Sequence, residues 1–277
     1  MPANVKPMLA TLTGKPFDDK NWLFEIKWDG YRAIAEIKDG NVKLHSRNNK
    51  SFNKKFSPIA DSLKIFEGEL IIDGEVVVID DEGASSFQML QNYQKSGAGN
   101  LVFYVFDFLY VNGYDLVKLP LIQRKNLLKK LALNIPNVRI SEHIEKDGIA
   151  FFKAAKENNL EGIIAKNCNS KYKPGIRAKD WLKIKVQLRQ EAVIGGFTQP
   201  KGSRKKIGAL VLGVYEKKDF TYIGHTGSGF SKADINDVYN KLKPLQRKTS
   251  PFKTEPKTNM PAVWVTPKIV CEIKFSE

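Results

Sequence analysis

The 277-residue sequence contains only two cysteines and three histidines. Cys168 and Cys271 lie far apart and match no spacing of metal ligands, which argues against a disulfide scaffold and against structural zinc. The three histidines form no triad-like string, so a hydrolase with a catalytic histidine has little support. Each cysteine is therefore predicted to be a small buried apolar residue.

The sequence also lacks an apolar run long enough to span a membrane, and its N-terminus has no charged-then-apolar leader. We therefore expect a soluble, cytoplasmic protein with no membrane partner. No G-x-x-x-x-G-K-[ST] string occurs, so the sequence does not support nucleotide binding by a P-loop. With 42% apolar residues, the chain is long enough for a good core and for two domains.

Basic residues outnumber acidic residues by 45 to 30, which gives a net charge of +15. This excess indicates a polyanionic partner, nucleic acid before membrane, because no basic amphipathic helix is evident. The last 89 residues are the more basic part, with 16 Lys and Arg against 8 Asp and Glu. Basic loops at 198–206 and 246–257 suit contacts with a phosphate backbone, although solvated surface is their default interpretation.

The most informative stretch is Glu25-Ile26-Lys27-Trp28-Asp29-Gly30-Tyr31-Arg32. Apolar residues flank Lys27, and Asp29-Gly30 predicts a tight turn into a second strand, so Lys27 is expected at the end of a strand. A lysine shielded from water is unfavourable unless it is paired or loses its proton. We predict that Lys27 attacks a nucleotide phosphate. The alternative is an ordinary strand lysine with its head in solvent.

The first 188 residues predict a mixture of strands and helices after an irregular lead-in over 1–20. The expected strands are 22–28, 31–37, 41–46, 76–79, 101–110, 161–166 and 181–185. An Asp39-Gly40 hairpin turn, an acidic turn at 73–75 and a Gly/Ser/Gln-rich loop through Gly99 are expected between them. One helix is expected to begin at Pro120, and a second has Asp147 as its predicted N-cap. Alternation places Ile164 and Lys166 on one face of their strand.

From Gln190 the pattern changes to short strands around one helix, which begins with the capping pattern Ser231-x-x-Asp234. Several short strands around one helix fit a β-barrel of the OB type. We therefore predict an α+β fold with one domain at 1–188 and a second at 189–277.

The string K-W-D-G-Y-R resembles the lysine motif of the covalent nucleotidyltransferases, the superfamily of DNA ligases, RNA ligases and mRNA capping enzymes. Further strings resemble other motifs of this superfamily, in the right order: Ser46-Arg47-Asn48-Asn49, Asp73-Gly74-Glu75, Phe106-Asp107-Phe108-Leu109, Glu161-Gly162-Ile163-Ile164-Ala165-Lys166 and Trp181-Leu182-Lys183-Ile184-Lys185. Asn49 stands where glycine is usual, and asparagine tolerates the positive φ that such a loop requires. The match covers roughly residues 20–275. It looks most like the ligase domain of bacterial multifunctional end-joining DNA ligases.

The resemblance implies an adenylation (nucleotidyltransferase) domain of antiparallel sheets and helices, followed by an OB-fold domain. It implies an ATP-dependent DNA ligase that seals nicks or broken duplex DNA through a lysyl-adenylate and a DNA-adenylate. The implied setting is DNA repair and recombination by non-homologous end joining in a bacterial cytoplasm, at the nucleoid, with fused or associated end-joining factors. The implied cofactors are ATP, which leaves AMP on Lys27, and Mg²⁺ or Mn²⁺.

The basic residues of these motifs have implied roles toward phosphate. Lys27 is the implied nucleophile. Arg32 and Arg47 are suited to ribose or phosphate oxygens, and Lys183 and Lys185 to the α-phosphate.

The acidic and aromatic residues have implied roles toward the metal ion, the ribose and the base. Glu75 and Glu161 are expected to bind a ribose hydroxyl or Mg²⁺, because hard oxygen ligands are what Mg²⁺ prefers. Phe106 is expected to stack on adenine, with Phe108 as the alternative. Glu25 is expected to read the adenine amino group, and Asp29 to orient the turn beside Lys27.

One family feature is absent from this sequence. Such ligases carry a last basic motif near the end of the OB domain, whereas this sequence stops at Phe275-Ser276-Glu277. We expect that the sequence is truncated or that another segment supplies the motif, and that this form charges itself poorly with ATP.

Three related enzymes and one other class remain as alternatives. An mRNA-capping guanylyltransferase would prefer GTP and RNA ends, and an RNA ligase usually lacks this OB region. An NAD-dependent ligase needs an extra N-terminal domain, for which residues 1–20 are too few. A non-catalytic nucleic-acid-binding OB module would show no effect of Lys27→Ala on any activity.

Overall fold

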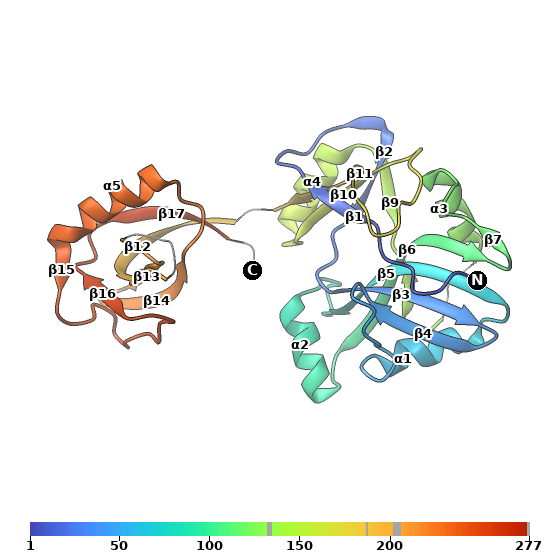
Figure 1. Cartoon of the computed structure of the whole chain (residues 1–277), viewed down its shortest axis with the longest axis horizontal. Helices are drawn as coiled ribbons and strands as arrows, with labels where there is room; N and C mark the ends of the chain where they lie inside the picture. The colour runs from blue at the N-terminus through green and yellow to red at the C-terminus, as the bar shows by residue number, and fades with distance from the viewer. Residues whose placement is uncertain (132–134, 187, 202–205, 276–277) are drawn as a thin grey trace. The chain divides into compact units, whose positions relative to one another are not determined.

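The computed structural model describes residues 1–131, 135–186, 188–201 and 206–275. The chain divides into two compact units after Val186, drawn in Figure 1. Both units combine β-sheets, largely antiparallel, with a few helices, so the predicted α+β class is confirmed. In the described part of the chain, no helix has the length and apolar character needed to cross a membrane.

The first unit is built on two sheets. One sheet has the order β1-β11-β10-β2-β9, and the other has the order β4-β3-β5-β6-β7 with β8 beside β6. The first sheet contains β1 (Leu9–Leu12), β2 (Asp19–Ile26), β9 (His143–Lys146), β10 (Gly162–Asn167) and β11 (Arg177–Lys185). The second contains β3 (Tyr31–Lys38), β4 (Asn41–Ser46), β5 (Glu69–Ile79), β6 (Asn100–Val111), β7 (Tyr114–Asp115) and β8 (Val138–Ile140). Only the pairs β1–β11 and β6–β8 are parallel among the described strands.

Helices cover the outer faces of both sheets. The helices of the first unit are α1 (Ser57–Ser62), followed by a short 3-10 turn (Leu63–Ile65), α2 (Phe87–Ser96), α3 (Leu121–Lys130) and α4 (Gly148–Glu157). Helices α1, α2 and α3 pack on the second sheet and α4 packs on the first (Figure 1). Alternation along β3 divides the core, because Ala33 and Ala35 face the helices whereas Ile34 packs with Phe106 and Trp181 between the sheets.

Several predicted local features are confirmed. Asp39 and Gly40 both have positive φ, 46° and 74°, as a tight hairpin turn requires. Asn49 has φ of 57°, so asparagine does replace glycine in that loop. Asp147 is the N-cap residue of α4, but its side chain makes no capping hydrogen bond.

Three predictions for the first unit were wrong. The lead-in contains β1, whose partner residues on β11 lie 168 to 171 positions away, as in the pairs Leu9–Arg177 and Leu12–Lys183, so no local pattern could reveal it. The segment predicted as a Gly/Ser/Gln-rich loop contains α2, capped by Ser86 and anchored by buried Leu90. Residues 73–75 are no turn but lie within β5.

In its described residues, the second unit is one six-stranded sheet with one α-helix. The sheet order is β14-β13-β12-β16-β15, and β17 also pairs with β12. Its elements are β12 (Leu188–Thr198), β13 (Leu210–Glu216), β14 (Asp219–Thr226), α5 (Lys232–Leu242), a 3-10 turn (Lys243–Leu245), β15 (Gln246–Arg247), β16 (Ala262–Val265) and β17 (Val270–Phe275). The predicted capping box is present, because Ser231 and Asp234 exchange backbone and side-chain hydrogen bonds.

The predicted basic loops belong to this unit. Residues 202–205 of the first loop, like Ser276 and Glu277 at the chain end, lie outside the described residues. The second loop is more than solvated surface, because its Phe252 is buried and stacks on Phe220 at a centroid distance of 4.6 Å. Both cysteines of the chain are free but only half-buried, which corrects the prediction of full burial.

Candidate active site

Lys27 immediately follows β2 and lines a cavity of about 250 Å³, as expected for a lysine at a strand end. Its backbone N–H donates to Gly162 O at 3.0 Å, and its side chain is 19% exposed. Lys27 Nζ forms an ion pair with one oxygen of Glu161, and Lys185 Nζ lies 2.7 Å from the other oxygen. Burial favours a higher pKa for Glu161, but the two lysines outweigh burial and lower it below its usual value.

The walls of this cavity carry more basic than acidic side chains. The basic residues are Lys27, Arg32, Arg47, Lys166, Arg177 and Lys183; the acidic residues are Glu25 and Glu75; the aromatic residues are Trp28, Phe106 and Trp181. Six basic against two acidic side chains make a favourable site for a compact polyanion such as a nucleotide triphosphate.

The structure brings most of the predicted site residues together. Seven of them line the cavity: Glu25, Lys27, Arg32, Arg47, Glu75, Phe106 and Lys183. Glu161 and Lys185 join this group through the ion pairs with Lys27. Phe108, the alternative stacking residue, packs instead in the core beneath the helices. Asp29 accepts a hydrogen bond from Phe87 N at 2.8 Å, so it ties the turn beside Lys27 to the start of α2.

Arg32 is held rigidly at one side of the cavity. Its Nε and Nη2 each lie 2.6 Å from the carboxylate of Asp73, which is fully buried. Tyr172 donates its hydroxyl to the same carboxylate at 2.6 Å. The guanidinium carbon lies 4.4 Å from the centre of the Phe106 ring, so Arg32 also packs on the aromatic wall.

Glu75 lies opposite Arg32 in the β3–β5 register. Burial raises its pKa from 4.5 to about 8, although Arg32 and Lys27 act in the opposite direction. Near neutral pH the group is therefore largely a carboxylic acid, which can donate a hydrogen bond as well as accept one.

Glu25 is enclosed by two buried lysines. Its Oε1 lies 2.6 Å from Lys125 Nζ and its Oε2 lies 2.8 Å from Lys166 Nζ. Burial lowers the pKa of Lys166 to about 8. Lys166 Nζ also lies 4.1 Å from the ring centre of Phe106 and 4.3 Å from that of Trp181. Arg32 and Lys166 thus both lie over the Phe106 ring. Stacking of adenine on this ring therefore remains a prediction, and it requires both side chains to move away from the ring.

Sequence reasoning gave no role to four charged or aromatic residues of the cavity wall, Trp28, Lys166, Arg177 and Trp181. Lys166 could have been found, because Ile164 and Lys166 were placed on one strand face and both line the cavity. Arg177 carries no sequence signal and reaches the cavity only because β11 lies beside β1. Within the described residues, no group of three or more His, Cys, Asp and Glu could hold a metal ion by itself.

Both parts of the chain match models of protein families. Residues 7–185 match the ATP dependent DNA ligase domain, and residues 203–277 match the ATP dependent DNA ligase C terminal region.

Two relatives illustrate the range of lengths in which such sequences occur. The chain is 37% identical over 286 residues to the multifunctional non-homologous end joining protein LigD of Pseudomonas aeruginosa, covering all of this chain and 34% of that protein. It is 39% identical over 197 residues to the SPbeta prophage-derived DNA ligase-like protein LigB of Bacillus subtilis, covering 70% of this chain and 72% of that protein. The chain therefore spans about a third of the length of its LigD relative.

A solved structure agrees in fold. The mycobacterial DNA ligase D complexed with ATP and MES is 31% identical, with a TM-score of 0.63, and the match covers 99% of this chain and 90% of that one. The fold therefore combines a nucleotidyltransferase domain with an OB-fold domain, as the motifs implied. Since one family model alone covers more than half of the sequence, the chain belongs to the ATP-dependent DNA ligase family.

Proposed function

We propose that this chain is the catalytic part of a DNA ligase, with residues 1–188 as the adenylation domain and 189–277 as the OB domain. The observation that carries the proposal is the position of Lys27. Its amine contacts Glu161 and lines a cavity with five other basic side chains. A nucleophile surrounded by cations suits attack on a phosphate, because the cations offset the negative charge of the substrate.

The first step is the transfer of adenylate to Lys27. The Nζ of Lys27 attacks the α-phosphorus of ATP, an N–P bond forms, and the P–O bond to pyrophosphate breaks. Pyrophosphate departs with the bonding electrons, and Glu161 is placed to accept the proton that the amine loses. Arg47 and Lys183 line the same cavity and position the phosphates, since such transfers depend mainly on positioning and charge neutralisation.

The later steps pass adenylate to DNA. The 5′-phosphate at a nick takes the adenylate from Lys27, and the 3′-hydroxyl then displaces AMP and joins the strand. Phe106 and Glu25 receive the adenine in this proposal, Phe106 through its ring and Glu25 through its carboxylate. The basic second unit contributes contacts to the phosphate backbone of the duplex.

A divalent cation fits beside Lys27. Mg²⁺ commonly uses one or two carboxylates together with substrate phosphates and water. Glu161 and Glu75 are the two candidate carboxyl groups, and the charge of Lys27 acts on the pKa of both. When bound, Mg²⁺ or Mn²⁺ would neutralise charge on the phosphate oxygens. Glu75 has a pKa of about 8, so near neutral pH it would lose its proton when it binds the cation, whose charge favours the carboxylate.

The repair setting is proposed from similarity. LigD proteins named for non-homologous end joining align with the whole chain but are about three times longer. We infer that nicked or broken duplex DNA is the substrate, that other end-joining domains or factors act with this part, and that it works at the nucleoid.

Intact-protein mass spectrometry tests the proposal directly. The wild type should gain one adenylyl group after exposure to ATP and Mg²⁺, whereas Lys27→Ala and Lys27→Arg should not. Lys20→Ala, an exposed lysine on the same strand, serves as the matched control and should behave as the wild type. No gain by the wild type, together with no sealing of a nick already carrying adenylate, would reject the proposal.

The same measurement separates the enzyme classes. A guanylyltransferase would take up GMP from GTP in preference to AMP from ATP. A non-catalytic nucleic-acid-binding module would gain mass from neither nucleotide and would bind DNA equally well after Lys27→Ala.

A further inference from the structure

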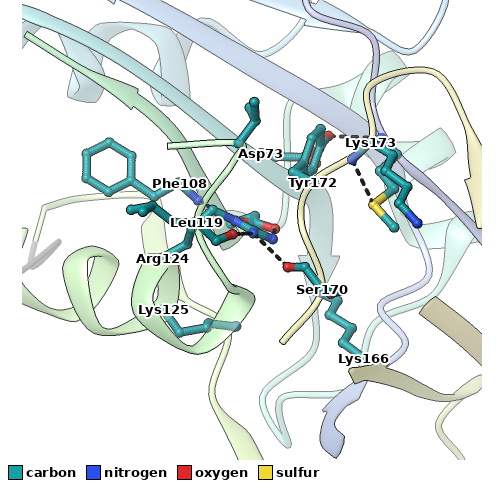
Figure 2. A network of polar contacts seen from close by, with 12 residues as sticks. Asp73, Phe108, Leu119, Arg124, Lys125, Lys166, Ser170, Tyr172 and Lys173 are labelled. Carbon is teal, nitrogen blue, oxygen red and sulfur yellow. Dashed lines mark hydrogen bonds and ion pairs between the residues drawn. The ribbon is translucent and has the colours of Figure 1, made fainter. Parts of the chain in front are cut away.

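The carboxylate of Glu25 has two buried lysine partners that differ in their access to the cavity. Lys166 lines the cavity, whereas Lys125 is absent from its described lining and lies behind Glu25 on α3. Lys125 is only 1% exposed, and its Nζ lies 2.6 Å from Glu25 Oε1 and donates to Ser141 O at 3.2 Å. Figure 2 shows Lys125 on its helix and Lys166 near the segment that carries Ser170. Lys125 therefore reaches a ligand in the cavity only through Glu25.

Among the described residues, Lys125 is the one cationic partner of Glu25 Oε1, and this buried oxygen makes no further hydrogen bond. Without Lys125, a fully buried carboxylate oxygen would have no partner. A buried carboxylate in that position is strongly unfavourable, and taking up a proton removes the unpaired charge.

The charges around Glu25 come from three neighbouring elements. Lys125 lies on α3 and Lys166 on β10, and these two lysines hold the pKa of Glu25 below its usual value against the opposing effect of burial. His143 lies opposite Glu25 on β9, and burial lowers its pKa, so it is uncharged near neutral pH. The charge of Asp107, on β6, acts to raise the pKa of Lys166, and Asp107 is not among the groups that shift the pKa of Glu25.

We propose that Lys125 is a positioning residue that keeps Glu25 an acceptor-only carboxylate, and that it thereby sets the preference for a 6-amino purine over a 6-oxo purine. This inference rests on the proposed function, in which Glu25 reads the adenine amino group. A carboxylate accepts from an exocyclic amine and repels a carbonyl oxygen, whereas a carboxylic acid can donate to that carbonyl. Substitution of Lys125 should therefore weaken the preference for the 6-amino purine, although Lys125 itself does not contact the nucleotide.

The experiment compares ATP with ITP, which carries a 6-oxo group in place of the 6-amino group. The rate at which each nucleotide modifies Lys27 is followed by intact mass, and the ratio of the two rates is the readout. Lys125→Met should lower the ATP-to-ITP ratio about tenfold, because a hydrogen bond to a charged group is lost at the base. Lys125→Arg keeps the charge and should preserve the ratio. Lys129→Met, an exposed lysine on the same helix, is the matched control.

A second arm follows the ratio against pH, and its wild-type measurement does not depend on the folding of a variant. Because Lys125 keeps Glu25 ionised, the wild-type ratio should stay constant from about pH 6 to about pH 7, an interval below the pKa of about 8 of Lys166, the other partner of Glu25. In Lys125→Met the ratio should rise across that interval, as Glu25 loses the proton it has gained.

The outcomes are distinguishable. A folded Lys125→Met with an unchanged ratio would overturn the inference, as would a wild-type ratio that falls toward pH 6. Failure of the wild type to gain mass from either nucleotide would reject the proposed function, and this inference with it.

Discussion

Arg124 and Asp107 form a two-bond ion pair in which both side chains are fully buried. Arg124 donates from Nε at 2.7 Å and from Nη2 at 2.9 Å to the two carboxylate oxygens. Its Nη1 donates to Leu119 O and to Ser170 O, as Figure 2 shows for the second contact. One side chain thus joins α3, β6 and the segment after β10. Because Asp107 directly follows Phe106, this pair fixes one wall of the cavity.

Arg124→Met should destabilise the protein by about 3–5 kcal/mol, because it leaves the buried carboxylate of Asp107 without its cation. The free energy of unfolding in guanidinium chloride measures the effect. The double variant Arg124→Met/Asp107→Leu should recover part of the loss, and Lys129→Met on the same helix should change little. Equal stability of Arg124→Met and the wild type would contradict the expectation.

Trp28 positions the residue that precedes it in the chain. Its ring stacks on Tyr104 at 3.7 Å with an angle of 6° between the planes, and its Nε1 donates to Ser141 Oγ at 3.1 Å. Trp28→Leu removes both contacts and should slow self-adenylation about tenfold, because small errors in position strongly reduce transfer rates. Trp28→Phe keeps the stacking and should show a smaller effect. Rapid-quench measurement of adenylate formation tests this, and a wild-type rate in Trp28→Leu would refute it.

Glu75 should make stability depend on pH. Its pKa is about 8 in the folded protein against 4.5 when unperturbed, so between these values the folded state binds the extra proton. The contribution of Glu75 to stability is therefore complete below about pH 4.5 and is lost as pH rises through about pH 8. The Tm of the wild type should fall relative to that of Glu75→Gln across this interval. Parallel Tm curves for the two proteins would show that the carboxyl is not held protonated.

Tyr172 connects the N-terminal segment to Asp73, the buried partner of Arg32. Its hydroxyl donates to Asp73 at 2.6 Å and accepts from Met8 N at 2.9 Å. Tyr172→Phe leaves two buried polar groups with fewer partners and should cost about 1–3 kcal/mol of stability. Denaturant unfolding checks this, with Tyr114→Phe as the exposed control in the same unit. An unchanged midpoint in Tyr172→Phe would show that water or another group replaces the hydroxyl.

Local sequence rules predicted the features whose causes are local. Asp39-Gly40 marked a hairpin because few residue pairs accept two successive positive φ angles. Ser231 and Asp234 marked the start of α5 because their spacing alone places both side chains on the first helical turn. The motifs around Lys27 and Lys183 likewise indicated the nucleotide chemistry, since each carries its functional residue types within a few positions of one another.

The tertiary structure decided what depends on residues that are distant in sequence. Lys166 lies 141 positions from Glu25, and no pattern indicated that it would share this carboxylate with Lys125. The protonation of Glu75 follows from burial between two sheets, which a sequence does not display. Strand β1 exists because β11 supplies its hydrogen bonds, not because of its own composition. The sequence by itself therefore determined the family and predicted which lysine reacts, because both depend on short motifs. Which charges surround that chemistry was decided only by the folded chain, because electrostatic interactions depend on distance in space and on burial.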